Sequence, residues 1–279
     1  MGRSLHDDSL RPSQDRGTSN DPSPRLISHE NRDQGGKSIY QSRGQRYRLN
    51  SDQSKMLQDL GAFRTIAANS LRKHLYDNND ERFRKDLRSL REQRLLNVQP
   101  GSRANGEYVA LTRAGKELTQ SALRYNRDQA VYSGIVKRRE LRHDAAIYDV
   151  YQIEAKKISK AGGTPKRVVL DFELKRQVNR QLAQIQTIPP AERERQRQEI
   201  AETHGLKIVE GKIQFPDVRI EFESRDQEQC KADLECVTGH YKARQIAAKQ
   251  AAGFKLYNQD YRGRSAERGE DLIGEVMSL

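Results

Sequence analysis

Three helical patterns in succession, followed by a short turn between two strand-like stretches, constrain the fold of residues 51–112 more than any other sequence feature does. In residues 51–63 apolar side chains recur at helical spacing, and Ser51 stands where an N-cap is expected. Residues 64–76 and 77–96 repeat the pattern, each with one apolar stripe and a polar opposite face. The sequence therefore predicts three consecutive amphipathic helices.

Two short strands are expected after these helices. Residues 95–100 and 107–112 favour extended structure, and the turn between them begins and ends with glycine. Three helices followed by a β-hairpin is the order of a winged helix-turn-helix. We therefore expect a winged helix-turn-helix domain over residues 45–125, continued by a further helix.

The third predicted helix carries positive charge on the face opposite its apolar stripe. A recognition helix needs such cations to reach phosphates and base edges in the major groove. The formal net charge of +12 also favours a polyanionic partner, and we expect double-stranded DNA. The alternatives are a basic protein without nucleic acid, or a solvated helix in a protein-binding module. The predicted DNA-binding residues are Arg82, Arg84, Lys85, Arg88 and Arg91 of the helix and Arg103 of the turn.

The remaining composition bears on order and location. Residues 1–44 are rich in Ser, Asp, Arg, Gly and Asn and show almost no apolar periodicity, so we expect a disordered arm there. No apolar run approaches the roughly 20 residues that span a bilayer, and the N-terminus lacks the apolar segment of a secretory signal. Cys230 and Cys236 cannot form a disulfide framework or a four-ligand zinc site by themselves. We expect reduced thiols, a cytoplasmic protein and no membrane partner.

The second half of the chain, residues 126–279, mixes helices and strands, which makes the predicted fold class α+β. A highly charged helix near residues 188–204 is expected to be an insertion. Strand alternation in residues 217–223 and 232–237 separates apolar from acidic side chains. If these two strands pair with their apolar faces together, their acids share the opposite face.

Clustered carboxylates are unfavourable unless something positive neutralises them, and a hard divalent cation does so through oxygen ligands. Such an ion activates water and stabilises a phosphoryl oxyanion. The predicted metal ligands are Asp217, Asp233, Glu235 and Glu154, the last from the preceding helix, and the expected ion is Mg²⁺ or Mn²⁺. His143 lies one helical turn before Ile147, on the same line as Glu154. The alternative is that the hairpin acids are simply solvated.

The stretches LTRAGKEL (111–118), RHDAAIYDVY (142–151), PDVRIEF (216–222) and DLECVTGHYKARQIAAKQAAGFKLY (233–257) resemble one known family. The chain resembles, over roughly residues 47–275, the replication-relaxation family of mobile genetic elements and the related MobC-type relaxases. The resemblance implies a winged helix followed by a restriction-endonuclease-like α/β domain with a PD-(D/E)XK core. It also implies DNA nicking with Mg²⁺.

The resemblance also implies roles for particular residues. Asp217 would be the first metal ligand, Glu235 with Asp233 beside it the strand carboxylates, and His143 part of the His-led segment ahead of the hairpin. The sequence departs from the motif at Val237, where a lysine is expected.

A lysine on the next helix could replace the missing one, either Lys242 or Lys249. We expect Lys242, which is closer to the end of the strand, and count it among the catalytic candidates. Tyr241 has the chemistry of a covalent nucleophile, but we expect it to pack with Tyr257.

These features predict a nicking, relaxase-like protein that acts in replication or mobilisation of a bacterial mobile element. The main alternative is a non-catalytic DNA-binding accessory or transcriptional regulator with a degenerate nuclease-like scaffold. A third class is a protein–protein adaptor, which fits the basic charge poorly. Other mobilisation or replication proteins would be natural partners, and the sequence leaves a homodimer open.

Overall fold

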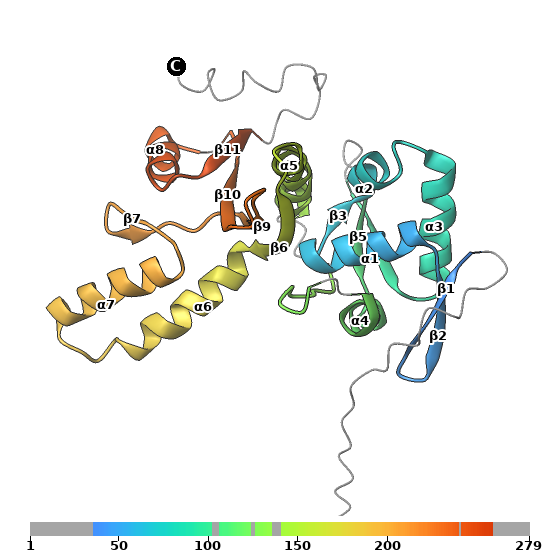
Figure 1. Cartoon of the computed structure of the whole chain (residues 1–279), viewed down its shortest axis with the longest axis horizontal. Helices are drawn as coiled ribbons and strands as arrows, with labels where there is room; N and C mark the ends of the chain where they lie inside the picture. The colour runs from blue at the N-terminus through green and yellow to red at the C-terminus, as the bar shows by residue number, and fades with distance from the viewer. Residues whose placement is uncertain (1–35, 102–105, 124–125, 136–140, 240, 259–279) are drawn as a thin grey trace, which may run out of the picture.

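The computed structural model describes residues 36–101, 106–123, 126–135, 141–239 and 241–258. Figure 1 shows an elongated molecule with the N-terminal helices at one end, a four-stranded sheet toward the other, and a long helix between them. The fold is α+β, as predicted. The expectations for residues 1–35 and for the turn with Arg103 lie outside the described residues.

The N-terminal part contains the three helices and the hairpin at the predicted positions. Their bounds are α1 Ser51–Phe63, α2 Ala68–Leu75, α3 Asp80–Glu92, β4 Leu96–Pro100 and β5 Glu107–Leu111. A two-residue strand, β3 Ile66–Ala67, pairs with β5, so the sheet order is β3-β5-β4. The N-cap of α1 is Asn50 rather than Ser51, and its side chain accepts from the Gln53 amide. Helix α4 Arg113–Leu118 and the π-helical turn η1 Thr119–Leu123 follow.

A second hairpin precedes α1 and corrects the expectation that residues 36–44 belong to a disordered arm. Strands β1 Ser38–Ser42 and β2 Gln45–Leu49 pair antiparallel through a two-residue turn. Arg43 and Gly44 both have positive φ, 48° and 78°, the requirement of the type I′ turn that suits the twist of a hairpin. Tyr47 and Leu49 of β2 are buried in the core, so the hairpin is part of the fold.

The C-terminal part is built on a mixed sheet of order β11-β10-β9-β6. Strand β9 is antiparallel to both β6 and β10, whereas β11 runs parallel to β10. The strands are β6 Thr164–Leu170, β9 Val218–Glu223, β10 Gln229–Val237 and β11 Lys255–Asn258. The helices are α5 Leu141–Lys160, α6 Asp171–Gln184, α7 Pro190–Thr203 and α8 Ala243–Ala251.

The charged segment expected near residues 188–204 forms α7, which extends with α6 away from the sheet (Figure 1). A small apolar cluster of Val178, Ala201 and Leu206 joins this pair of helices to the chain that follows. That chain includes the short strands β7 Ile208–Val209 and β8 Lys212–Ile213. The insertion therefore lies between β6 and β9 in sequence and beside the sheet in space.

Helix α5 joins the two parts. Its Tyr148 side chain is fully buried, packs edge-to-face on Phe63 with ring centroids 5.1 Å apart, and donates a hydrogen bond to Asp59 of α1 (2.6 Å). One continuous apolar core runs from α1 through α5 to the sheet. Within the described residues no helix is both long enough and apolar enough for a membrane crossing.

Candidate functional site

The register of β9 and β10 brings Asp217 and Glu235 to the same end and the same face of the sheet. Val218 is opposite Leu234, and the Asp217 amide just before β9 donates to the Leu234 carbonyl (3.0 Å). Asp217 therefore continues the pairing opposite Glu235. The apolar side chains of both strands point to the other face, against α5, because alternate residues of a strand face opposite ways.

Asp217 is held by contacts on both carboxylate oxygens. Its Oδ2 accepts from the Cys236 amide (2.7 Å), and its Oδ1 lies 3.2 Å from Nε2 of His143, near the start of α5. The hydrogen bond to the Asp217 carboxylate raises the pKa of His143 above its ordinary value, against the lowering effect of burial. His143, one of the predicted catalytic candidates, thus contacts Asp217 directly.

Glu235 is almost completely buried, with 1% of its surface exposed. Its Oε1 accepts from Nζ of Lys249 (2.8 Å) and from the hydroxyl of Tyr241 (2.9 Å). Its Oε2 is buried and has no hydrogen-bond partner among the described residues. Burial raises the pKa of Glu235, the nearby charge of Asp217 raises it further, and Lys249 opposes both effects.

The lysine at Glu235 is Lys249, not the expected Lys242. Lys242 is exposed and forms the N-cap of α8, whereas Lys249 lies in the last turn of the helix and also donates to the Phe215 carbonyl (2.6 Å). Tyr241 likewise departs from expectation. It bonds to Glu235 instead of packing with Tyr257, and burial is the largest cause of its raised pKa.

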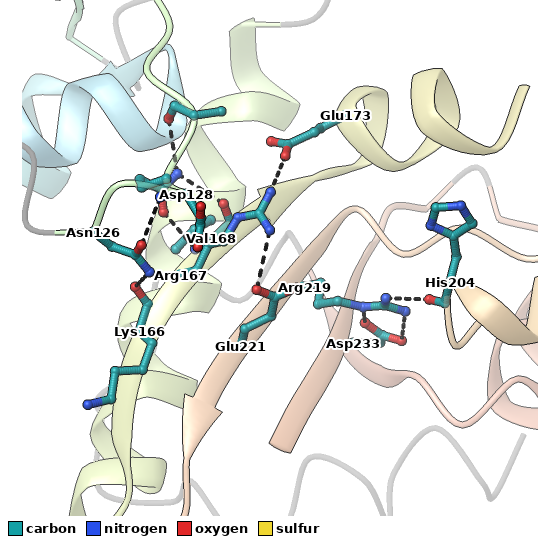
Figure 2. Close-up of polar contacts among 12 residues, drawn as sticks. Asn126, Asp128, Lys166, Arg167, Val168, Glu173, His204, Arg219, Glu221 and Asp233 are labelled. Carbon is teal, nitrogen blue, oxygen red and sulfur yellow. Dashed lines mark hydrogen bonds and ion pairs between the residues drawn. The ribbon is translucent and has the colours of Figure 1, made fainter. Parts of the chain in front are cut away.

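Asp233 shares the face of Asp217 and Glu235 but is neutralised by a different partner. Arg219, directly opposite it on β9, makes two bonds to its carboxylate, of 2.6 and 2.9 Å. Figure 2 shows the same guanidinium bonded to the backbone carbonyl of His204 (2.6 Å), at the end of α7. Asp233 therefore anchors the insertion to the sheet and is not part of the acidic group formed by Asp217 and Glu235.

Glu154 lies on the opposite side of the sheet. It pairs with Lys255 and accepts from the Tyr257 hydroxyl. These two residues are opposite Leu234 and Cys236 in the parallel ladder, so their side chains share the apolar face that α5 covers. The prediction of Glu154 as a ligand shared with Asp217 and Glu235 is wrong for this reason.

Asp217, Glu235 and Lys249 line an open groove of about 490 Å³ between the sheet, the β7–β8 hairpin and α8. Lys175, Lys212 and Arg244 add positive charge to its walls, and Phe215 and Tyr241 add aromatic surface. Arg244 pairs with Glu210 at the hairpin turn (2.6 Å). Such lining suits an anionic ligand with planar groups, as a nucleotide chain is.

Among the described residues no cluster of three or more His, Cys, Asp or Glu side chains is arranged to hold a metal ion. Asp217 and Glu235 nevertheless suit Mg²⁺, which proteins bind through one or two carboxylates with water and phosphate completing the shell. The unpartnered Oε2 of Glu235 is the observation that supports this fit, because a buried carboxylate oxygen without a donor is costly.

The cations predicted to contact DNA on α3 are all exposed. Arg82 pairs with Asp52 of α1, and Arg84 pairs with Asp80 (2.7 Å). The other three make no ion pair with a described residue: Lys85, Arg88 and Arg91. The face opposite them is buried through Phe83, Leu87 and Leu90, as the sequence predicts.

Comparison of the chain with protein-family models, curated proteins and solved structures finds no match.

Proposed function

We propose that this protein binds duplex DNA through α3 and nicks a DNA strand in the groove beside α8. The observation that carries the proposal is the meeting of Asp217, Glu235 and Lys249 at the floor of a cationic groove. Two carboxylates from neighbouring strands and one ammonium are the groups that metal-assisted phosphodiester cleavage needs.

The topology supports the finer fold assignment in this proposal. Helix α5, three antiparallel strands, helix α8 and a strand parallel to the third follow one another as in a PD-(D/E)XK core. Helices α1 to α3 with the three-stranded sheet β3-β5-β4 match a winged helix-turn-helix. With the resemblance to the replication-relaxation family, these features support a role in replication or mobilisation of a mobile genetic element.

Each residue of the site has a role in this proposal. A bound Mg²⁺ or Mn²⁺ would supply Lewis-acid activation of the phosphate and a more acidic water. Asp217 and Glu235 would hold that ion, and the ammonium group of Lys249 would stabilise negative charge on a bound phosphate group. His143 fixes the orientation of Asp217 through their hydrogen bond, and Tyr241 does the same for Glu235.

A second function is favoured by one observation. Lys249 already neutralises Glu235, and the described residues contain no group of three metal-ligating side chains. In this alternative the chain is a DNA-binding accessory protein or regulator whose groove holds a phosphate group without cutting.

A nicking assay on supercoiled plasmid with added Mg²⁺ or Mn²⁺ separates the two functions. We expect Asp217→Asn, Glu235→Gln and Lys249→Met each to lower the nicking rate by about 100-fold or more, and Lys242→Met to retain it. Wild-type protein that shifts the plasmid in a gel but never relaxes it with either ion would establish the accessory function. Full activity in Glu235→Gln would refute the assignment of the site.

A further inference from the structure

A second groove lies between the β1–β2 hairpin and the C-terminal half of α3. It has a volume of about 370 Å³ and is lined by Lys37, Arg46 and Arg48 of the hairpin and by Ser89, Glu92 and Gln93 of the helix. Three cations face one carboxylate, so the groove has a net positive charge. Figure 1 shows the hairpin beside the end of α3, far from α8 and β7.

The hairpin is fixed to α3 by its backbone. The Arg48 amide donates to Oε1 of Gln93 (3.0 Å), and the Gln93 amide nitrogen donates back to the Arg48 carbonyl (3.2 Å). Buried Tyr47 and Leu49 anchor the same strand from its other face. Because strand residues alternate, this anchoring turns Arg46 and Arg48 together toward the solvent side.

The positive charge of the two arginines is not neutralised by an ion pair within the described residues. Neither Arg46 nor Arg48 makes an ion pair with a described residue, although Arg43 on the same hairpin pairs with Glu117 (3.1 Å). Two exposed guanidinium groups on one face of a strand add to the positive potential of a basic chain and attract anions to this face. Guanidinium binds phosphate oxygens with particularly good geometry.

The groove continues the cationic face of α3. Ser89 and Glu92, which line it, lie one helical turn from Lys85 and Arg88, which are predicted to contact DNA. A DNA duplex that contacts α3 would therefore also pass close to the β1–β2 hairpin. We propose that the β1–β2 hairpin is a second DNA contact, in which Arg46 and Arg48 bind backbone phosphates of the duplex segment flanking the α3 site.

This inference rests on the proposed DNA binding by α3 and adds a segment that winged-helix geometry alone does not require. The occupant is the phosphate backbone and not a base edge. The groove presents charged side chains from one strand and the end of a helix, without an element that enters the major groove. The hairpin should then add affinity without adding sequence preference.

The test measures the affinity of the full chain for fluorescein-labelled duplexes of mixed sequence over a range of salt concentrations. One duplex is about one helical turn long, and the other about three turns. The variant Arg46→Gln/Arg48→Gln should bind the long duplex about 50-fold more weakly at about 0.1 M salt, because each lost phosphate contact removes about 0.9 from the slope of log K against log salt. The short duplex offers fewer flanking phosphates than the long one, so the loss of affinity should be smaller there.

Three controls make the outcomes distinct. Arg43→Gln removes one positive charge, half the change of the double variant, from the same hairpin outside the groove and should leave the slope nearly unchanged. Arg46→Lys/Arg48→Lys should retain most of the affinity. Lys85→Gln/Arg88→Gln should weaken binding to both duplexes, since it alters the α3 contact itself.

An unchanged affinity and slope for Arg46→Gln/Arg48→Gln on the long duplex, with α3 variants still impaired, would overturn the hairpin contact and leave DNA binding by α3 intact. Absence of binding by the wild-type chain to either duplex would instead refute the proposed function on which the inference depends. Equal losses for Arg43→Gln and the double variant would show that only overall charge matters, and would also overturn it.

Discussion

Replacing Lys249 by methionine tests the pairing on which the candidate site depends. Methionine keeps the apolar stem of lysine and removes its ammonium group, which lies 2.8 Å from Oε1 of Glu235. The carboxylate of Glu235 is 1% exposed and cannot recover its lost partner from solvent. In the variant we expect Glu235 to adopt one of two states. It either remains ionised without a positively charged partner in the protein interior, or it takes up a proton.

Protonation of Glu235 sets an upper limit to the loss in the free energy of unfolding. An ordinary Glu has a pKa of 4.5, so protonating Glu235 at pH 7 crosses about 2.5 pH units at about 1.36 kcal/mol each. Lys249→Met should therefore lower the free energy of unfolding by about 3 kcal/mol at pH 7. At pH 5.5 only about one pH unit remains, and the loss should fall to about 1.4 kcal/mol. The value at pH 7 lies at the lower end of the range of about 3–5 kcal/mol for removing one partner of a buried pair.

Urea denaturation at the two pH values, in buffer with a chelator, measures this difference. Lys242→Met is the matched control, since Lys242 is on the exposed N-cap of the same helix. It should change stability by less than about 0.5 kcal/mol at either pH. Adding Glu235→Gln to Lys249→Met should restore much of the lost stability, because no buried charge is then left unpaired.

A loss that is the same at pH 7 and pH 5.5 would refute this reasoning. It would assign the effect to the lost hydrogen bond from Lys249 to the Phe215 carbonyl, or to packing, and not to the charge of Glu235. An equal loss of stability in Lys242→Met would show that Lys249 is not the lysine that specifically neutralises Glu235.

Three further predictions follow from other buried charges. Burial raises the pKa of Asp59 to about 6, so its ionised form costs stability at neutral pH; Asp59→Asn should stabilise the chain by up to about 3 kcal/mol at pH 7, with a gain that shrinks as pH falls below 6 in urea titrations. The raised pKa of His143 gives stability that is full below pH 6.5 and lost as pH rises through the raised value, so His143→Gln should destabilise the chelated protein mainly at the acidic end, and an effect confined to alkaline pH would contradict the contact with Asp217. Asp233→Asn should lower the melting temperature, since Arg219 loses its partner, yet should leave the Mg²⁺ dependence of plasmid nicking unchanged.

The N-terminal helices could be predicted because their signals are local and long. Residues 80–92 bury Phe83, Leu87 and Leu90 and expose their arginines, as the helical period requires. The β1–β2 hairpin escaped prediction because Ser, Arg, Gln and Gly dominate it. The alternation of Tyr47 and Leu49 after an Arg-Gly turn was the only local signal of this hairpin. The contact that fixes the hairpin comes from Gln93, which is distant in sequence.

In the candidate site, too, local patterns predicted some residues correctly and contacts between distant segments decided the others. Strand alternation correctly put Asp217 and Glu235 on one face, because register follows from burying the apolar side chains. The choice of Lys242 failed because distance along the chain ignores the path of α8. A helix that connects two parallel strands runs back along the sheet, so Lys249 in its last turn comes to lie beside Glu235 of β10. The prediction of Asp233 as a metal ligand is wrong because Arg219, directly opposite it on β9, binds its carboxylate.

The placement of the two cationic surfaces leads to a final prediction. Figure 1 shows α3 and the β1–β2 hairpin at one end of the molecule, and α8 with the β7–β8 hairpin at the other, with α5 between them. A straight duplex lying along α3 and the hairpin therefore does not enter the groove that contains Glu235. Nicking should occur outside the segment that α3 protects, on a bent flank, on another duplex or in the groove of a second copy of the chain.

Footprinting and nick mapping on one end-labelled DNA fragment would measure this separation. A nick at the centre of the segment protected by Lys85 and Arg88 would contradict the arrangement. Loss of nicking on a duplex of about one turn, with binding retained, would support it, because such a duplex cannot reach both surfaces of one chain.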